Sequence, residues 1–159
     1  MIEFLLEILA LVGETLYAGS VAAFCLLLLA RKRVADGASE RVIRVFRAWG
    51  PGQGIAMGAL ILGNAGLYYL EKGGFHWSFD TPADVLVAIQ HGVFLLLWAS
   101  SFHLEIWTLE PCRKFDIDGQ VSDRVAYERA ARRVSFQIGL NLLLIMACGG
   151  LGLAVESLM

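Results

Sequence analysis

Charged residues are scarce in this chain: Asp, Glu, Lys and Arg make up 18% of its 159 residues, whereas hydrophobic residues make up 57%. This composition excludes intrinsic disorder, which requires few hydrophobic residues and a high net charge. Three cysteines are too few for a disulfide scaffold, and a net charge of −2 gives no support to a basic nucleic-acid-binding domain. With a mean hydropathy of +0.63, the chain is predicted to be a membrane protein.

The motifs of several large enzyme classes are also missing. The sequence has no Walker, GxSxG, HExxH or dinucleotide-binding fingerprint, and it has no CxxC or CxxCH motif. Attachment of a c-type haem through CxxCH is therefore excluded. Cys25, Cys112 and Cys148 are predicted to lie at different depths in the membrane, so an internal disulfide is not expected. The absence of these motifs leaves open whether the protein is an enzyme.

Four long apolar stretches can each cross a bilayer core, which requires roughly 20 mostly apolar residues in a helix. They cover residues 4–30, 51–70, 83–107 and 134–155. Period-two alternation is absent, and a helix satisfies its own backbone hydrogen bonds in lipid, so we predict an all-α fold. Glu3 and Glu7 stand where a signal peptide has Lys or Arg, which favours a retained first helix. The whole chain, residues 1–159, is predicted to be one domain, a bundle of four transmembrane helices.

Lys and Arg are concentrated in two of the three connecting loops. Six lie in residues 31–50 and six in residues 108–133, whereas Lys72 alone lies between the second and third stretches. Because basic loops stay on the cytoplasmic side, both termini are predicted to lie outside. In a bacterial-type cell, this orientation corresponds to a multi-pass protein of the inner (cytoplasmic) membrane with periplasmic termini.

The two basic loops have the sequence patterns of ordered structure. Residues 41–49 place apolar and basic side chains on different faces, which predicts an amphipathic helix at the lipid headgroups. Gly50 and Pro51 are expected to end that helix and to start the second span. Residues 116–119 are predicted to form a turn, and Ser122 is expected to cap the helix that follows.

Ionisable side chains inside the apolar stretches are candidates for function, because a charge is costly within a bilayer. His91 and His103 are the candidate cofactor ligands, since imidazole commonly ligates haem iron and copper. They lie twelve positions apart on one helix, about 18 Å along its axis and ~120° around it, so they cannot bind one ion together. Haem b or copper is the cofactor considered, with Glu14 as a partner of His91 at a metal site. Hydrogen bonding between helices is the alternative role for each residue.

Small and amide side chains in the second and fourth stretches have the spacing of helix-packing residues. Six positions are predicted to pack against other helices: Gly50, Gly54, Gly58, Asn64, Gln137 and Asn141. The glycines form a stripe that permits the close approach of two helices. The amides can form hydrogen bonds between helices, which contribute about 0.6 kcal/mol each on average.

Three short motifs resemble a known membrane family. They are the aromatic–small–glycine step at Leu16–Gly19, the basic, glycine-punctuated segment Arg44–Gly52, and the Phe102–His103 pair. In these motifs and in its layout, the chain resembles the four-helix unit shared by the CopD copper-resistance proteins and the HemJ-type protoporphyrinogen oxidases. The resemblance implies a four-helix membrane architecture and an association with haem or copper. HemJ-type proteins carry a histidine where this chain has Leu9, so the resemblance implies the architecture more strongly than protoporphyrinogen oxidation.

Two functions are predicted as alternatives. The first is a haem- or metal-associated membrane protein in electron transfer or in copper or haem handling. The second is a non-catalytic anchor or accessory subunit that packs against a larger membrane complex. In both cases the expected partners are the lipid bilayer and either a second copy of the chain or a larger complex, with no nucleic acid.

Overall fold

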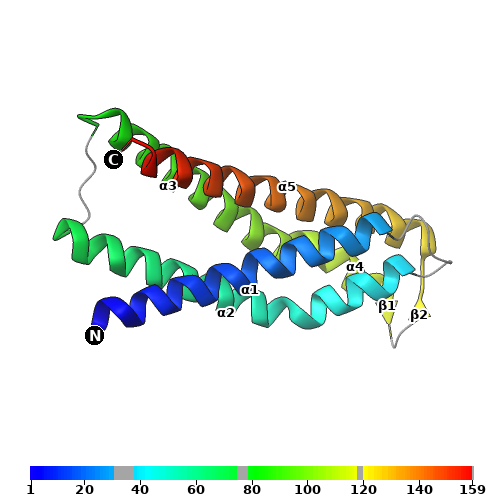
Figure 1. Ribbon diagram of the computed structural model, residues 1–159. Helices are drawn as coiled ribbons and strands as arrows, with labels where there is room; N and C mark the ends of the chain where they lie inside the picture. Colours follow the sequence, from blue (N-terminus) through cyan, green and yellow to red (C-terminus); the bar gives the residue numbers. More distant parts are fainter. Residues whose placement is uncertain (31–37, 75–78, 118–119, 159) are drawn as a thin grey trace.

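The structure is a computed structural model that describes residues 1–30, 38–74, 79–117 and 120–158 (Figure 1). Its elements are, in chain order, α1 (Ile2–Ala30), α2 (Ala38–Lys72), α3 (Pro82–His103), the π-helical turn η2 (Leu104–Thr108), α4 (Glu110–Phe115), β1 (Asp116–Ile117), β2 (Gln120–Val121) and α5 (Arg124–Glu156). The two short strands pair in antiparallel fashion. The turn predicted at 116–119 is described only as far as β1, because residues 118–119 lie outside the described residues. The rest of the described chain is almost entirely helical, which confirms the all-α prediction.

Three helical runs among the described residues are long and apolar enough to cross a membrane: α1, residues 82–115 and α5. These runs confirm a multi-pass membrane protein. The helix α2 has 35 residues and is not among these runs. A crossing by α2 therefore stays a prediction.

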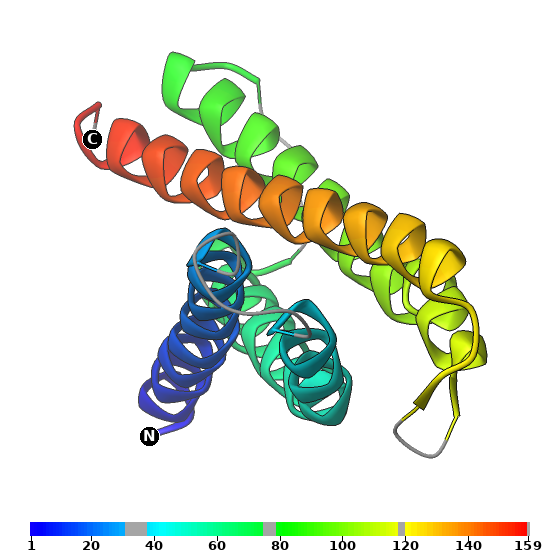
Figure 2. The same ribbon diagram turned by 90° about the vertical axis from the view of Figure 1, so that its right-hand side faces the viewer.

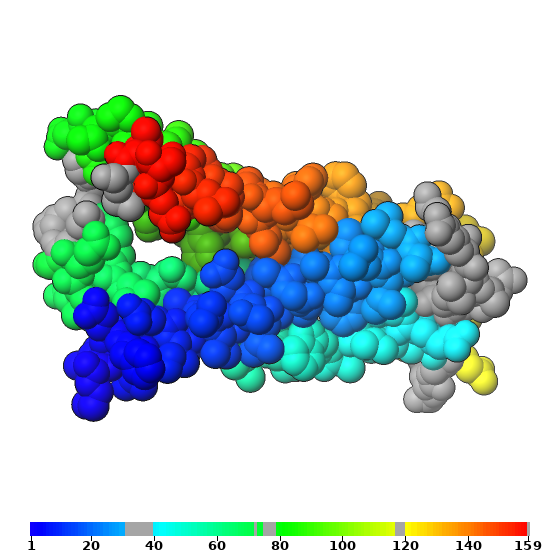
Figure 3. Space-filling view, in the orientation of Figure 1, coloured from blue at the N-terminus to red at the C-terminus, as the bar shows by residue number. Residues whose placement is uncertain are grey.

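The helices form two antiparallel pairs, α1 with α2 and α3 with α5 (Figure 1). Both termini lie at one end of the molecule, and the two strands lie at the other. Figure 2 shows that the pairs are inclined to each other rather than parallel. On the face drawn in Figure 3, the molecule is hollowed between the pairs toward the end with the termini. The buried hydrophobic residues of α1 accordingly run from Tyr17 to Leu28, in the half that leads to the strands.

The helix α2 is continuous through Pro51, so the prediction that the amphipathic helix ends at Gly50 and Pro51 is wrong. A proline removes one main-chain hydrogen bond and bends a helix, but contacts on both sides can keep it whole. Before Pro51, the ring of Phe46 packs edge-on against Phe24 of α1, with ring centroids 4.7 Å apart. After Pro51, the buried side chain of Met57 belongs to the same core. Packing against α1 therefore holds the two parts of α2 together as one helix.

The helix α5 begins one residue later than expected. A main-chain N–H of its first turn donates to the carboxylate of Asp123 at 3.0 Å, so the prediction that Ser122 caps this helix is wrong. The Ser122 hydroxyl instead donates to the carbonyl oxygen of Phe115 at 3.2 Å. That bond joins the end of β2 to the end of α4. The Ser122 hydroxyl is thus engaged elsewhere, and Asp123 caps α5.

The close contact between α1 and α2 is made at Gly13 and Gly63, outside the predicted glycine stripe. A Cβ atom at Gly63 would lie 2.7 Å from the Cα atom of Ala10, and one at Gly13 would meet the backbone of α2 as closely. A Cβ atom at Gly54 or Gly58 would have no described atom within 4 Å. Within this chain, those two glycines therefore do not have the predicted packing role. Helical spacing showed that they share a face, but it could not show which face of the helix meets α1.

Replacing Gly63 with Ala is expected to destabilise the protein, whereas Gly54→Ala is not. The methyl group at Gly63 would overlap main-chain atoms of α1, which cannot move aside as a side chain can, at a cost of about 1–3 kcal/mol. At Gly54 it meets open space, and Ala favours the helix by about 1 kcal/mol over Gly. Thermal unfolding of the detergent-purified variants measures the difference. A Gly63→Ala variant that unfolds at the wild-type temperature would contradict the close contact.

Candidate functional site

Polar side chains between α1, α3 and α5 form hydrogen bonds that centre on Ser101. The Ser101 hydroxyl donates to the carbonyl oxygen of Leu97 at 2.7 Å, so in its bond with Tyr17 the phenol is the donor. The Asn141 amide also donates to Ser101, at 3.2 Å. Tyr17 is 2% exposed and Asn141 is 1% exposed. Three helices are therefore joined at the hydroxyl of one half-buried serine.

Further bonds extend this group along α3 and to α2. The Ser100 hydroxyl donates to the Asn141 carbonyl oxygen, and the Gln137 amide donates to Ser100 Oγ at 2.6 Å. On the other side, the Gln53 amide of α2 donates to Ser20 Oγ of α1 at 3.1 Å. Seven residues, here called the polar network, thus link all four long helices: Tyr17, Ser20, Gln53, Ser100, Ser101, Gln137 and Asn141.

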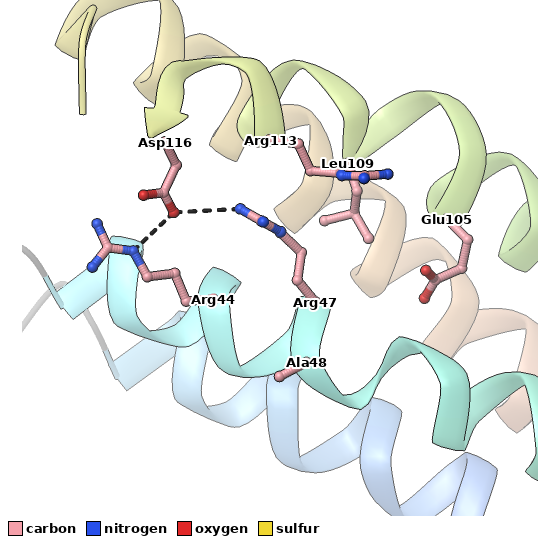
Figure 4. Close-up of a pocket in the computed structure, with 7 residues that line it drawn as sticks. All are labelled: Arg44, Arg47, Ala48, Glu105, Leu109, Arg113 and Asp116. Carbon is pink, nitrogen blue, oxygen red and sulfur yellow. Dashed lines mark hydrogen bonds and ion pairs between the residues drawn. The ribbon is translucent and has the colours of Figure 1, made fainter. Parts of the chain in front are cut away.

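A charged pocket lies at the end of the bundle that carries the strands (Figure 4). Its volume is about 560 Å³, and its lining comprises Arg44, Arg47, Ala48, Glu105, Leu109, Arg113 and Asp116. The residues come from α2, η2, α4 and β1, so the pocket exists only where the two helix pairs meet. Guanidinium groups from α2 and α4 and two carboxylates give it a mixed charge.

Asp116 holds two of the pocket's arginine side chains in place. Its carboxylate is 5% exposed and accepts from Arg44 Nε at 2.8 Å and from Arg47 Nη1 at 3.3 Å (Figure 4). The hydrogen bond to Asp116 raises the pKa of the Arg44 guanidinium above its usual value, so this group stays charged at physiological pH. The amphipathic helix predicted to present its arginines to lipid headgroups thus directs two of them toward β1.

Glu105 lies between the charged pocket and the polar network. It belongs to the π-helical turn η2, a conformation that is frequent at functional sites. Its Oε1 atom is buried, and no described residue donates a hydrogen bond to it. Its Oε2 atom lies where a Cβ atom at Gly50 would be only 2.8 Å away. Glu105 is half-buried and follows Ser101 of the polar network by four residues, so it lies between the two groups of polar residues along the chain.

The two candidate histidines lie in different surroundings. The half-buried His91 donates from Nδ1 to the carbonyl oxygen of Val87 at 2.7 Å, and its ring packs against Tyr68 of α2 with centroids 5.5 Å apart. The exposed His103 pairs through Nδ1 with Thr108 Oγ1 at 3.1 Å. Because a carbonyl oxygen can only accept, Nδ1 of His91 carries a proton in this hydrogen bond.

The other predicted site residues are not brought together. Glu14 is exposed on α1, and the described residues contain no group of three or more His, Cys, Asp or Glu side chains that could hold a metal ion. Asn64 is exposed and donates to the carbonyl oxygen of Leu60 on its own helix at 2.9 Å, so it does not form the hydrogen bond between helices that was predicted. Gln137 does bond across to α3, and Gly50 packs against a side chain of η2.

Five residues of these sites were not predicted from the sequence: Tyr17, Ser100, Ser101, Glu105 and Asp116. Serine and tyrosine are common in apolar helices, where a serine can satisfy its hydroxyl on its own backbone. Two adjacent serines within an apolar stretch were the signal that could have been used. Asp116 gave no signal, since its arginine partners lie about 70 positions earlier in the chain.

No family model, no curated protein and no solved structure matches this chain. The resemblance to the CopD and HemJ-type family therefore stays a prediction from short motifs. Within those motifs, Tyr17 belongs to the polar network, and Arg44 and Arg47 line the charged pocket.

Replacing Asn141 with Leu is expected to lower stability, because Ser100 then loses its acceptor and Ser101 loses a donor. The cost should be roughly 1–2 kcal/mol, the upper range for hydrogen bonds between membrane helices. Asn64→Leu is the matched control, since its amide bonds only within α2 and is exposed. Thermal unfolding in detergent measures both. Equal unfolding temperatures of the two variants would contradict a stabilising role of the polar network.

Proposed function

We propose that all four long helices cross the bilayer and that both termini lie on the outer side. The 35 residues of α2 extend for about 52 Å at 1.5 Å per residue, longer than a bilayer core of ~30 Å. Both termini lie at the same end of the bundle (Figure 1). Nine of the ten Lys and Arg residues that the structure describes lie in the first part of α2, in α4 and in the first part of α5, toward the opposite end, which supports a cytoplasmic location for that end.

Reporter fusions test this orientation. A reporter that is active only outside the cytoplasm should be active when fused after Met159 and inactive when inserted at Gly119. The expected difference follows from the distribution of basic residues between the loops. Activity at Gly119 with none after Met159 would show the opposite orientation. Activity at both positions would show that α5 does not cross the membrane.

We infer that the charged pocket binds a phosphate-bearing ligand at the inner face of the membrane. The observation that carries this function is the convergence of Arg44, Arg47 and Arg113 from two helices on one cavity. Guanidinium groups bind phosphate through several directed, charge-assisted hydrogen bonds. Basic pockets between membrane helices on the cytoplasmic side commonly bind lipid headgroups.

Exposed tryptophans support a pocket at the level of the headgroups. Trp49 follows Arg47 on α2 and is 41% exposed, and Trp107 follows Glu105 on η2 and is 60% exposed. Tryptophan is enriched at both membrane–water interfaces, where its ring lies at headgroup depth. A phosphate could therefore reach the pocket either on a lipid headgroup or on a soluble molecule from the cytoplasm.

Removing an arginine from the pocket should weaken phosphate binding about tenfold or more, since a charge-assisted hydrogen bond contributes at least that much. The variants are Arg47→Gln and Arg113→Gln. Arg132→Gln, exposed on α5, has the same charge change outside the pocket and serves as the control. Native mass spectrometry with added phosphatidylglycerol, and titration with inorganic phosphate, measure the binding. Equal binding by all three variants and the wild type would refute this function.

Haem binding at His91 is a second candidate function. Its support is the hydrogen bond from Nδ1 to Val87, because a haem-ligating histidine usually donates its other ring N–H to a carbonyl or carboxylate. His91 would hold a haem there, and the haem would supply electron transfer; Tyr68 packs against the imidazole ring of His91. A copper site at His91 and Glu14 is not proposed, since Glu14 is exposed and belongs to no group of metal ligands among the described residues.

The haem hypothesis predicts a Soret band in the purified, haem-supplemented protein that His91→Ala abolishes. His103→Ala should retain the band, because His103 is exposed and lies in other surroundings. The absorption spectra of the three proteins are the measurement. A colourless wild type, or a band that survives in His91→Ala, would count against haem and in favour of an anchor or accessory subunit.

A further inference from the structure

We propose that the charged pocket selects a ligand in which a primary ammonium group lies beside the phosphate, with Glu105 binding the ammonium. This is the chemistry of phosphoethanolamine, either as the headgroup of an aminophospholipid or as a free molecule. The proposal rests on the proposed phosphate-binding function and names its ligand class. Two features of the pocket support it: Glu105 Oε1 has no hydrogen-bond donor among the described residues, and Glu105 lines the same cavity as the arginines.

The first feature is the unsatisfied Oε1 atom of Glu105. Its Oε1 atom is buried, and none of the described residues donates to it. An ionised carboxylate can only accept hydrogen bonds, and leaving a buried acceptor unpaired is costly. The pocket therefore offers an acceptor to any ligand that brings a donor or a positive charge.

The arginines of the pocket are engaged by other carboxylates. Arg44 and Arg47 both donate to Asp116, and Arg113 forms an ion pair with Glu110 at 3.5 Å. No ion pair joins Glu105 to any arginine among the described residues. The pocket thus holds guanidinium groups on one side and an unpaired carboxylate on the other, which matches a ligand with both charges.

The second feature is that the two kinds of group line the same cavity beside α2. The Glu105 carboxylate packs against Gly50, which lies three residues after Arg47 on α2. The carboxylate and the arginines therefore line neighbouring parts of one cavity, as a ligand that carries a phosphate and an ammonium in one molecule requires. Gly50 has no side chain, so the Glu105 carboxylate can pack directly against the backbone of α2.

The charge of the lining agrees with this class of ligand. Three guanidinium groups and two carboxylates give a formal charge of +1, too small to favour a multiply charged anion strongly. A phosphoethanolamine headgroup carries one charge of each sign. A phosphocholine headgroup carries the same charges, but its quaternary ammonium has no N–H to donate to Glu105. Discrimination between these two headgroups is therefore the property that Glu105 would confer.

The test compares phosphatidylethanolamine with phosphatidylcholine of the same acyl chains, by native mass spectrometry of the full-length protein. The wild type should favour phosphatidylethanolamine about tenfold, the value of a charge-assisted hydrogen bond. Glu105→Gln should lose this preference while it still binds both lipids through the arginines. Glu128→Gln, exposed on α5, is the control with the same charge change. Gly50→Ala, whose methyl group would press on the carboxylate, should weaken the preference without altering any charge.

The outcomes separate this inference from the function on which it rests. Equal binding of the two lipids by the wild type, with loss in Arg47→Gln and Arg113→Gln, overturns the ammonium site and leaves the phosphate site. Binding that is indifferent to both arginines overturns both. Free phosphoethanolamine and phosphocholine form the second arm of the test. A preference seen with the lipids alone identifies a headgroup as the ligand, and the same preference with the free molecules identifies a soluble one.

Discussion

The hydrogen bonds at Ser100 and Ser101 are the contact on which the arrangement of the two helix pairs depends. Apolar helices in lipid gain little by preferring one rotation over another, because side chains and lipid tails are similarly apolar. A buried hydroxyl or amide loses its partner when a helix turns, so polar groups fix the rotation that packing leaves free. Tyr17, Asn141 and Gln137 converge on the two serines, which orients α1 and α5 against α3.

The charged pocket follows from that arrangement. Once α3 is fixed at Ser101, the π turn one helical turn later carries Glu105 toward α2 at Gly50. Beyond the turn, α4 and β1 bring Asp116 over the first part of α2, where it pairs with two arginines. Both helix pairs contribute to the pocket, whereas the opposite end is hollowed between them (Figure 3). The position of the pocket is thus tied to the half of the bundle in which the pairs are joined.

The sequence predicted the elements better than it predicted the contacts between them. Apolar length predicted helices that can cross a membrane, and the amides Gln137 and Asn141 were correctly expected to bond between helices. The end of a helix at Pro51 was expected and is not observed, because a local rule for proline does not include the support of a neighbouring helix. The glycine stripe had the right spacing for close packing, yet the close contact is at Gly63.

Composition and hydropathy by themselves determined that the chain is a helical membrane protein, because lipid requires each crossing segment to satisfy its own backbone. They also determined which segments are apolar and where the basic residues gather. Only the tertiary structure decided which faces meet, since a helical period is the same whichever face is buried. The pairing of Asp116 with Arg44, and the burial of Glu105 beside Gly50, join segments more than 50 residues apart. Local sequence patterns do not predict contacts between segments so far apart. The residues that line the pocket therefore come together only when the helices pack.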